Sequence, residues 1–406
     1  MGFFINNHDV NYRAKYLLFI LWPFGSFIYA LRSLQSKSSR VIFFMICMVF
    51  GLCIECKTDA YDMSRITEIF HSFKDANYHD LKLIISDSFA GIGEKDLYES
   101  SLCWIVNKIS NNHHVFWMIA SSIYSIFYLK SLSYILDDKR FKSTLVGFLI
   151  VFMFTLVEPI FAVTGLRFWT AGWIAICCTL KIIIDRKYEY FILLLLTPLI
   201  HITYTIYIVL FIVFLMIKGK RKLISGFVLI SFILSYSSLD FIKIVGEFSL
   251  VPDHLQAMIM SYTSLYHILE FNEEGTGFFW LQQLFDFILK LYYFFMIVIL
   301  ITRGKTDSKI DIQLLNFTLI VFSFSNFMIN VPHLGIRYIS FSQIILPVCW
   351  LRFFGLEKYK WFIYLYPLCS LFYLIRIRLY NYANVLEFDF LYNSLPTMLF
   401  NNLILI

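Results

Sequence analysis

Residues 190–217 read YFILLLLTPLIHITYTIYIVLFIVFLMI, and this stretch decides the class of fold. It contains no Asp, Glu, Lys or Arg, while basic residues lie on both sides of it, at 186–187 and at 218–222. As one helix it would measure about 42 Å, which exceeds a hydrocarbon core of roughly 30 Å. A charge-free stretch of this length is suited to lipid rather than to the interior of a soluble protein.

The rest of the chain has the same character. Hydrophobic residues make up 59% of the 406 residues and charged residues only 15%, against about 25% charged residues in soluble domains. A soluble globule of this composition would expose more apolar surface than monomers tolerate. The composition therefore excludes a cytosolic enzyme, a secreted disulfide scaffold and a disordered chain. It predicts an all-α, polytopic integral membrane protein.

Apolar runs and the basic connections between them predict about 11 to 12 transmembrane segments. The apolar runs are 16–31, 41–54, 115–136, 144–161, 168–184, 190–217, 223–239, 278–301, 312–329, 339–351 and 361–375. The first run lacks a small-residue cleavage site, so we expect a retained span rather than a signal peptide. Cytoplasmic loops are enriched in Lys and Arg, which accounts for the net charge of +6 and places the basic connections inside.

The run 190–217 conflicts with this rule if it crosses the membrane once, because both of its flanks are basic. Pro198 interrupts the helical hydrogen bonds, and His201 follows it. We therefore expect a broken helical hairpin with its apex near 197–204, on the outer side, which keeps both basic clusters inside. A single tilted helix is the alternative. Such a break is tolerated only where protein or a water-filled cavity lines it.

This topology gives a single transmembrane domain over 1–406, with extracytoplasmic loops at 55–112 and 240–277. It places the N-terminus and the C-terminal tail outside. Helical spacing of apolar residues over 64–85 and 98–109 predicts amphipathic helices at the outer interface, and 253–270 is a third candidate.

Ionisable residues in or beside apolar segments are the candidates for chemistry, since they are costly in lipid and face cavities or partners. The expected topology brings four such places to the outer side of the membrane. They are Arg167 at the start of an apolar helix, His201 at the break, His333 and Arg337 in the turn NVPHLGIRY (330–338), and a first-loop set of Asp59, Tyr61, Asp62, Arg65, Tyr98 and Glu99. Taken singly, an Arg at a span end also snorkels to headgroups, and a lone His is also a structural group.

The order of these short patterns resembles the Wzy-type polysaccharide polymerases, especially their EpsG-like branch. The resemblance covers roughly residues 16–395. The patterns are TDAYDMSR (58–65) with Asp59 and Tyr61, the pair Tyr98-Glu99, the helix start Arg167 with Ala171, the element LIHIT (199–203), and Arg337 before a late span. Two positions depart from the family pattern: Lys57-Thr58 stand where an Arg and a Gly are common, and Ser100 stands where Pro is common.

The resemblance implies an enzyme that polymerises undecaprenyl-diphosphate-linked oligosaccharide repeat units at the outer face of the bacterial inner membrane. It implies membrane lipid, a flippase and a chain-length regulator as partners, and no cofactor, metal or nucleic acid. Arg167 and Arg337 suit the departing diphosphate, because Arg is a permanent, bidentate cation. His201 suits the base for the acceptor hydroxyl, with Glu99 and Asp59 as alternatives. Tyr61, Tyr98, Trp104 and His333 are the expected sugar contacts.

Two other classes compete with this interpretation. A lipid-linked oligosaccharide flippase or transporter would show an internal repeat and few large outer loops, whereas this sequence has two long loops and no evident repeat. Another membrane transferase, such as an O-acyltransferase, needs a His with access to a cytoplasmic acyl donor. An outer position for His201 argues against that activity.

Overall fold

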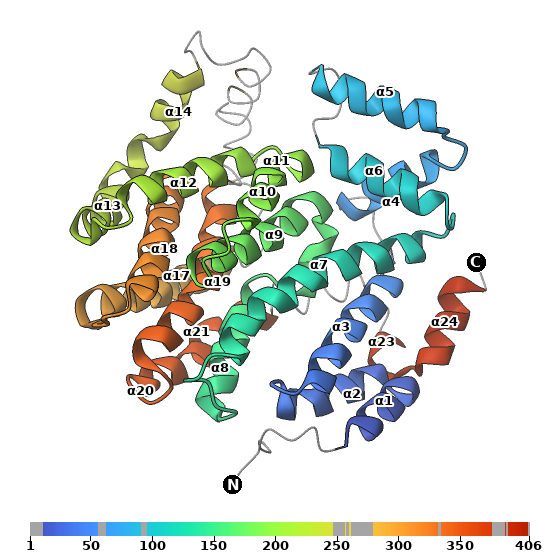
Figure 1. Cartoon of the computed structure of the whole chain (residues 1–406), viewed down its shortest axis with the longest axis horizontal. Coiled ribbons are helices and arrows are strands. Elements are labelled where there is room, and N and C mark those ends of the chain that lie inside the picture. The colour runs from blue at the N-terminus through green and yellow to red at the C-terminus, as the bar shows by residue number, and fades with distance from the viewer. Residues whose placement is uncertain are drawn as a thin grey trace. The chain divides into compact units, whose positions relative to one another are not determined.

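The computed structural model describes residues 11–55, 62–90, 96–246, 256, 260, 279–331, 334–375, 386 and 389–404. Within these residues the regular structure is helical, with a single isolated bridge between Ile54 and Leu386 (Figure 1). In the part of the chain that the structure describes, six helices are long and apolar enough to cross a membrane: His113–Leu136, Leu145–Thr164, Leu166–Ile183, Gln283–Arg303, Lys309–Phe327 and Leu334–Phe354. The all-α, polytopic membrane architecture is therefore confirmed.

The chain packs as two compact units. Unit 1 comprises residues 1–205, 356–364 and 374–406, and unit 2 comprises residues 206–355 and 365–373. The helices of unit 1 are α1 (Tyr12–Leu21), α2 (Pro23–Ala30), α3 (Lys37–Leu52), α4 (Asp62–Ser72), α5 (Tyr78–Phe89), α6 (Leu97–Asn107), α7 (His113–Leu136), α8 (Leu145–Val157), α9 (Leu166–Ile183), α10 (Tyr190–Leu195), α11 (Thr197–Ile200), α20 (Lys360–Tyr364), α23 (Asp389–Tyr392) and α24 (Leu395–Leu403).

The core of unit 1 is built from α3, α7 and α9, which lie side by side (Figure 1). Gly51 lets α3 approach α7 closely, because a Cβ there would lie 2.3 Å from the Trp117 carbonyl oxygen. The two helices are antiparallel: Arg40 at the start of α3 pairs with Asp137, directly after the end of α7. At 24 residues, α7 is about 36 Å long. The two ends of unit 1 are thus a membrane thickness apart.

The expected first span at 16–31 is wrong. Trp22 and Pro23 break it into α1 and α2, of 10 and 8 residues, and α2 folds back along α1. The ammonium group of Lys15, in α1, donates hydrogen bonds to the hydroxyls that precede and begin α3, at 2.8–3.0 Å from Ser36, Ser38 and Ser39. Residues 16–31 therefore fold back on themselves. The start of α1 lies beside the basic loop that precedes α3, and not across the membrane from that loop.

Helices form in the two segments of the first long loop, 64–85 and 98–109, where amphipathic helices are expected. The helix expected over 64–85 is divided into α4 and α5 by a turn, and α6 covers most of 98–109. Ile66 and Phe70 of α4 and Val106 of α6 are fully buried where α4 packs on α6. Ile109 is exposed, contrary to its place on the expected apolar face. The third candidate, 253–270, lies outside the described residues apart from two isolated positions.

The interruption of 190–217 is confirmed. Helix α11 ends at Ile200, residues 201–203 are not helical, and α12 (Tyr204–Ile217) begins immediately after them. Helices α10 and α11 pack along α9. Asp185, after the end of α9, accepts a hydrogen bond from Tyr134 near the end of α7, whereas Tyr204 donates to the Phe168 carbonyl in the first turn of α9. Between Asp185 and Tyr204 the chain therefore runs from the C-terminal end of α9 back to its N-terminal end. A hairpin return along α12 stays a prediction.

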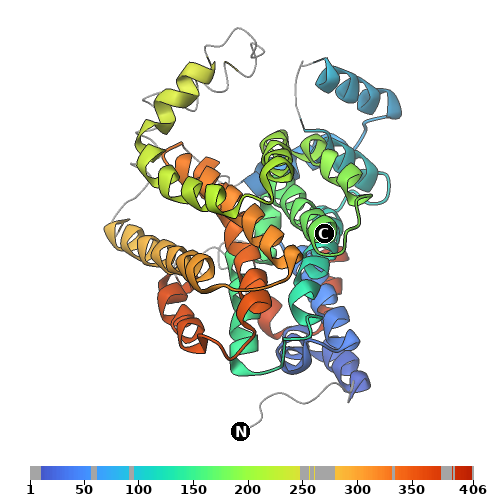
Figure 2. The same ribbon diagram turned by 60° about the vertical axis from the view of Figure 1, so that its left-hand side comes forward.

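Unit 2 holds most of α12 and several of the helices that follow it. These are α13 (Arg221–Leu234), α14 (Ser238–Gly246), α17 (Phe279–Arg303), α18 (Lys309–Phe327), α19 (Leu334–Phe354) and α21 (Tyr366–Phe372). Helix α18 is central, with α13 and α19 packed against it (Figures 1 and 2). An ion pair at 2.5 Å between Arg352 and the buried Asp311 joins α19 to α18.

Candidate functional site

Two buried carboxylates mark the start of α6. Asp96 occupies the N-cap position of this helix and Glu99 lies in its first turn. The N-terminal end of a helix favours negative charge, so both positions suit acidic residues. The Asp96 side chain makes no capping bond, because its oxygens are used elsewhere. The Glu99 residue is 0% exposed, so its charge must be balanced by partners within the protein.

Arg167 supplies part of that balance. It lies in the first turn of α9, and its guanidinium contacts both acids, with Nη1 3.2 Å from Asp96 Oδ2 and Nε 2.9 Å from Glu99 Oε2. A cation is disfavoured at the first turn of a helix by the helix dipole. The two carboxylates offset this cost, so the starts of α6 and α9 hold each other in place.

A second guanidinium binds the same glutamate. Arg65 of α4 donates to Glu99 through both terminal nitrogens, at 3.1 Å to Oε1 and 3.2 Å to Oε2. This side-by-side geometry is the strongest form of the Arg–carboxylate pair. Asp62, one turn earlier, lies 3.8 Å from Arg65 Nε. Glu99 is thus shared by two arginines from two different helices.

His201 belongs to the same end of unit 1. Asp96 Oδ1 accepts a hydrogen bond of 3.1 Å from the backbone N–H of Ile202, the residue next to His201. The imidazole Nδ1 lies 2.9 Å from the Thr203 hydroxyl, and the ring packs edge-on against Phe168, with centroids 5.3 Å apart. The non-helical residues 201–203 are therefore held by α6 through Asp96 and by the first turn of α9 through Phe168.

We call Arg65, Asp96, Glu99 and Arg167 the carboxylate–arginine cluster. Its acids are buried and its bases reach the surface: the side chains of Glu99 and Asp96 are 0% and 7% exposed, those of Arg167 and Arg65 25% and 37%. Buried ion pairs are costly unless each charge is bonded from several sides, and Glu99 and Asp96 meet this condition. The groups of the cluster that a ligand can reach are therefore its guanidinium groups.

The aromatic candidates differ in their surroundings. The Tyr98 hydroxyl is buried, and this burial raises the pKa of the phenol above its usual value. Only part of its ring is accessible to a sugar. Trp104 donates its indole N–H to the Asn77 carbonyl at 3.1 Å and packs against Tyr78, whose ring centroid is 6.2 Å away. These contacts lie outside the carboxylate–arginine cluster, and the expected sugar contact of Trp104 stays a prediction.

The structure brings together Arg167, Glu99 and His201, which the sequence analysis had placed at one site from separate patterns. It adds Asp96, which the sequence analysis missed, and gives Arg65 a place at the site's centre. The signal for Asp96 was its position three residues before Glu99, on the same helix start. Arg337 lies in the first turn of α19 in unit 2, so its sharing a site with Arg167 stays a prediction. Asp59, Tyr61 and His333 lie outside the described residues.

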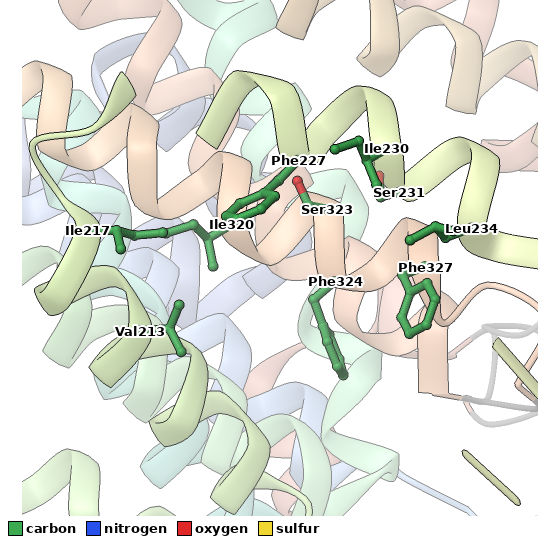
Figure 3. A pocket seen from close by; sticks show the side chains of 10 residues that line it. All are labelled: Val213, Ile217, Phe227, Ile230, Ser231, Leu234, Ile320, Ser323, Phe324 and Phe327. Atoms are coloured by element: carbon green, nitrogen blue, oxygen red, sulfur yellow. The ribbon is translucent and has the colours of Figure 1, made fainter. Parts of the chain in front are cut away.

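Unit 2 contains an apolar groove between α12, α13 and α18 (Figure 3). The hydroxyls of Ser231 and Ser323 donate to carbonyls of their own helices, which leaves the wall of the groove apolar. The lining residues are Val213, Ile217, Phe227, Ile230, Ser231, Leu234, Ile320, Ser323, Phe324 and Phe327.

Among the residues that the structure describes, no group of three His, Cys, Asp or Glu side chains is arranged to hold a metal ion. Comparison with family models, curated proteins and solved structures yields no match to this chain. The functional argument therefore depends on the residues and geometry described above.

Proposed function

We propose that this protein polymerises oligosaccharide repeat units carried on undecaprenyl diphosphate, at the outer face of the bacterial plasma membrane. The observation that carries the proposal is the convergence of Arg167, Glu99 and His201, from α9, α6 and the interruption after α11, at one end of unit 1. These are the positions at which the sequence resembles the polysaccharide polymerases. A membrane enzyme acting on a lipid diphosphate needs a cation for the leaving group and a base for the incoming hydroxyl.

In the proposed reaction, the bond between the anomeric carbon and the diphosphate oxygen breaks, and a new bond forms to a hydroxyl oxygen of the acceptor sugar. The bonding electrons leave with the diphosphate, whose added charge is stabilised by Arg167, and by Arg337 as the resemblance implies. The hydroxyl proton passes to His201, which is partly exposed and held in orientation by Thr203. Asp59 is the alternative base. The apolar groove of unit 2 suits a polyprenyl chain (Figure 3).

Replacement of Arg167 tests the proposal. Arg167→Gln should abolish polymer while single repeat units still reach the cell surface, because only their joining requires the leaving-group contact. Surface polysaccharide resolved by length on gels is the measurement, with the amount of inserted protein checked by immunoblot. Arg337→Ala should behave in the same way.

A matched control is Arg140→Gln. Arg140 pairs with Asp138 at 3.2 Å, and its side chain is 42% exposed, at the other end of unit 1 beyond α7. This substitution removes an ion-paired, partly exposed arginine without touching the site. Full-length polymer in Arg167→Gln would reject the proposal. Loss of surface units altogether would favour a flippase.

A further inference from the structure

We infer that Arg65 is a second diphosphate-binding residue and that Glu99 is not a base but the positioning residue that holds Arg65 and Arg167 side by side. The ligand class is a diphosphate. The inference rests on the proposed function for the identity of the lipid substrate, but the binding of a diphosphate is measurable without any glycosyl transfer.

The geometry of Glu99 excludes it from accepting the proton of a sugar hydroxyl. Both of its oxygens are already bonded to guanidinium groups, Oε1 to Arg65 and Oε2 to Arg65 and Arg167. The side chain is fully buried, so no hydroxyl reaches it without displacing an arginine.

The same contacts explain how two arginines remain close together. Each carries a full positive charge, and two such groups on one ligand would repel each other in the empty site. Glu99 lies between them and neutralises this repulsion from the buried side. A diphosphate has two phosphate groups, each able to accept from one guanidinium, and Arg is the residue best suited to this planar, bidentate recognition.

The acids and the bases of the cluster differ in their exposure to solvent. The side chains of Glu99 and Asp96 are buried, whereas those of Arg167 and Arg65 are 25% and 37% exposed. A ligand that arrives from outside the protein therefore meets guanidinium edges first and the carboxylates last. With Asp62, which lies 3.8 Å from Arg65 Nε, the site holds two positive and three negative charges. Because the contacts between the guanidinium groups and a diphosphate are electrostatic and partly exposed, diphosphate binding should weaken as salt rises.

Calorimetric titration of the purified, full-length protein tests the inference with two ligands, inorganic pyrophosphate and farnesyl diphosphate, in detergent at matched ionic strength. Pyrophosphate tests recognition of the diphosphate alone, and the prenyl ligand tests whether a lipid is preferred. We expect wild-type protein to bind both, the prenyl ligand more tightly. Arg65→Gln should weaken both by about tenfold or more, the range for a lost charge-assisted hydrogen bond. Arg140→Gln should bind as wild type does.

Glu99→Gln separates positioning from catalysis. The amide keeps the size of the side chain but loses its charge, so both arginines become less well held. We expect weaker pyrophosphate binding and a residual transfer rate whose pH profile keeps the wild-type shape. If Glu99 were the base, binding would be unchanged and the acidic limb of the profile would disappear. Arg65→Lys, which keeps the charge without the paired geometry, should restore part of the affinity lost in Arg65→Gln and guards against a folding defect.

Unchanged pyrophosphate affinity in both Arg65→Gln and Arg65→Lys would overturn the inference, as would wild-type protein that binds pyrophosphate no better than chloride. The proposed function fails separately. If Arg65→Gln weakens binding but Arg167→Gln still makes full-length polymer, the cluster is a diphosphate site and the proposed role of the cluster in polymerisation is rejected. If polymer is lost only in Arg167→Gln, the function stands and the role of Arg65 is wrong.

Discussion

At the scale of single residues, Asp96 links the two halves of the site. One oxygen holds Arg167 and the other holds the backbone of Ile202, so the position of the cation and the position of the imidazole depend on the same carboxylate. An N-cap Asp ordinarily uses its side chain to bond the first N–H groups of its helix. Here that stabilisation is forgone, which indicates that the connection across the site matters more than the helix end.

Thr203 makes the role of His201 testable. For Nε2 to take a proton, Nδ1 must carry the ring hydrogen and donate it to the Thr203 hydroxyl, 2.9 Å away. The backbone N–H of Thr203 also lies 3.4 Å from Nδ1 and favours the opposite tautomer. Thr203→Val removes the hydroxyl acceptor and keeps the backbone donor. We expect transfer to slow by about tenfold when purified protein polymerises lipid-linked units, which is less than the roughly 10²–10⁴-fold that a general base contributes, because the imidazole itself is kept.

Thr203→Ser is the control, because it keeps the hydroxyl, and it should retain most of the wild-type rate. A Thr203→Val protein with the wild-type rate would remove His201 from the role of base and pass it to another residue.

Sequence reasoning found Arg167, Glu99 and His201 because charged or titratable residues in apolar surroundings are costly, and the topology rule assigned them to one side. It did not find Asp96, since an acidic residue in a polar loop is ordinary until its burial is known. It also gave Arg65 no special role. The pairing of Arg65 with Glu99 joins residues 34 positions apart, and no periodicity along the chain encodes such a contact.

At the scale of helices, hydrophobicity predicted where α3, α7, α8 and α9 lie, but not the fold of the first run. An average over residues 16–31 hides the Trp22-Pro23 break, and a proline at the first position of a new helix is a natural start. The position of Lys15 was also uninformative by itself. Its burial is explained by the serines that precede and begin α3, which the tertiary fold brings around its ammonium group.

Gly51 is the residue on which the α3–α7 contact depends. A Cβ at this position would lie 2.3 Å from the Trp117 carbonyl oxygen and 2.4 Å from Ser121 Oγ, so the two helices would have to separate. We expect Gly51→Ala to lower the free energy of unfolding by about 1–3 kcal/mol, as overpacking of a core does. Chemical denaturation in detergent, followed by circular dichroism, is the measurement.

The matched control is Gly226→Ala on α13, where an added Cβ would meet no atom within 4 Å. Alanine is the better helix former, so this variant should be unchanged or more stable by about 0.5–1 kcal/mol. Equal stability of the two variants would show that close approach at Gly51 does not constrain the packing of α3 and α7.

At the scale of the whole molecule, the fold of α1 and α2 changes the expected topology at the N-terminus. Lys15 contacts the serines that begin α3, and Arg40, the residue directly after the last of them, pairs with Asp137 beyond the end of α7. The start of α1 therefore shares an end of unit 1 with the basic residues that the positive-inside rule assigns to the cytoplasm. The C-terminal helix reaches the opposite end, where the Asn402 carbonyl accepts a hydrogen bond from Asn112.

Labelling of introduced cysteines distinguishes the two topologies. Tyr12, Lys37 and Lys108 are exposed, the first two at the end of unit 1 where α3 begins and the third at the end of α6. In intact cells, an impermeant thiol reagent should modify Lys108→Cys but neither Tyr12→Cys nor Lys37→Cys, which should react only after permeabilisation. The wild-type protein gives the background from its native cysteines. A single span over 16–31 would instead place position 12 with position 108, so labelling of Tyr12→Cys in intact cells would refute the folded-back arrangement of α1 and α2.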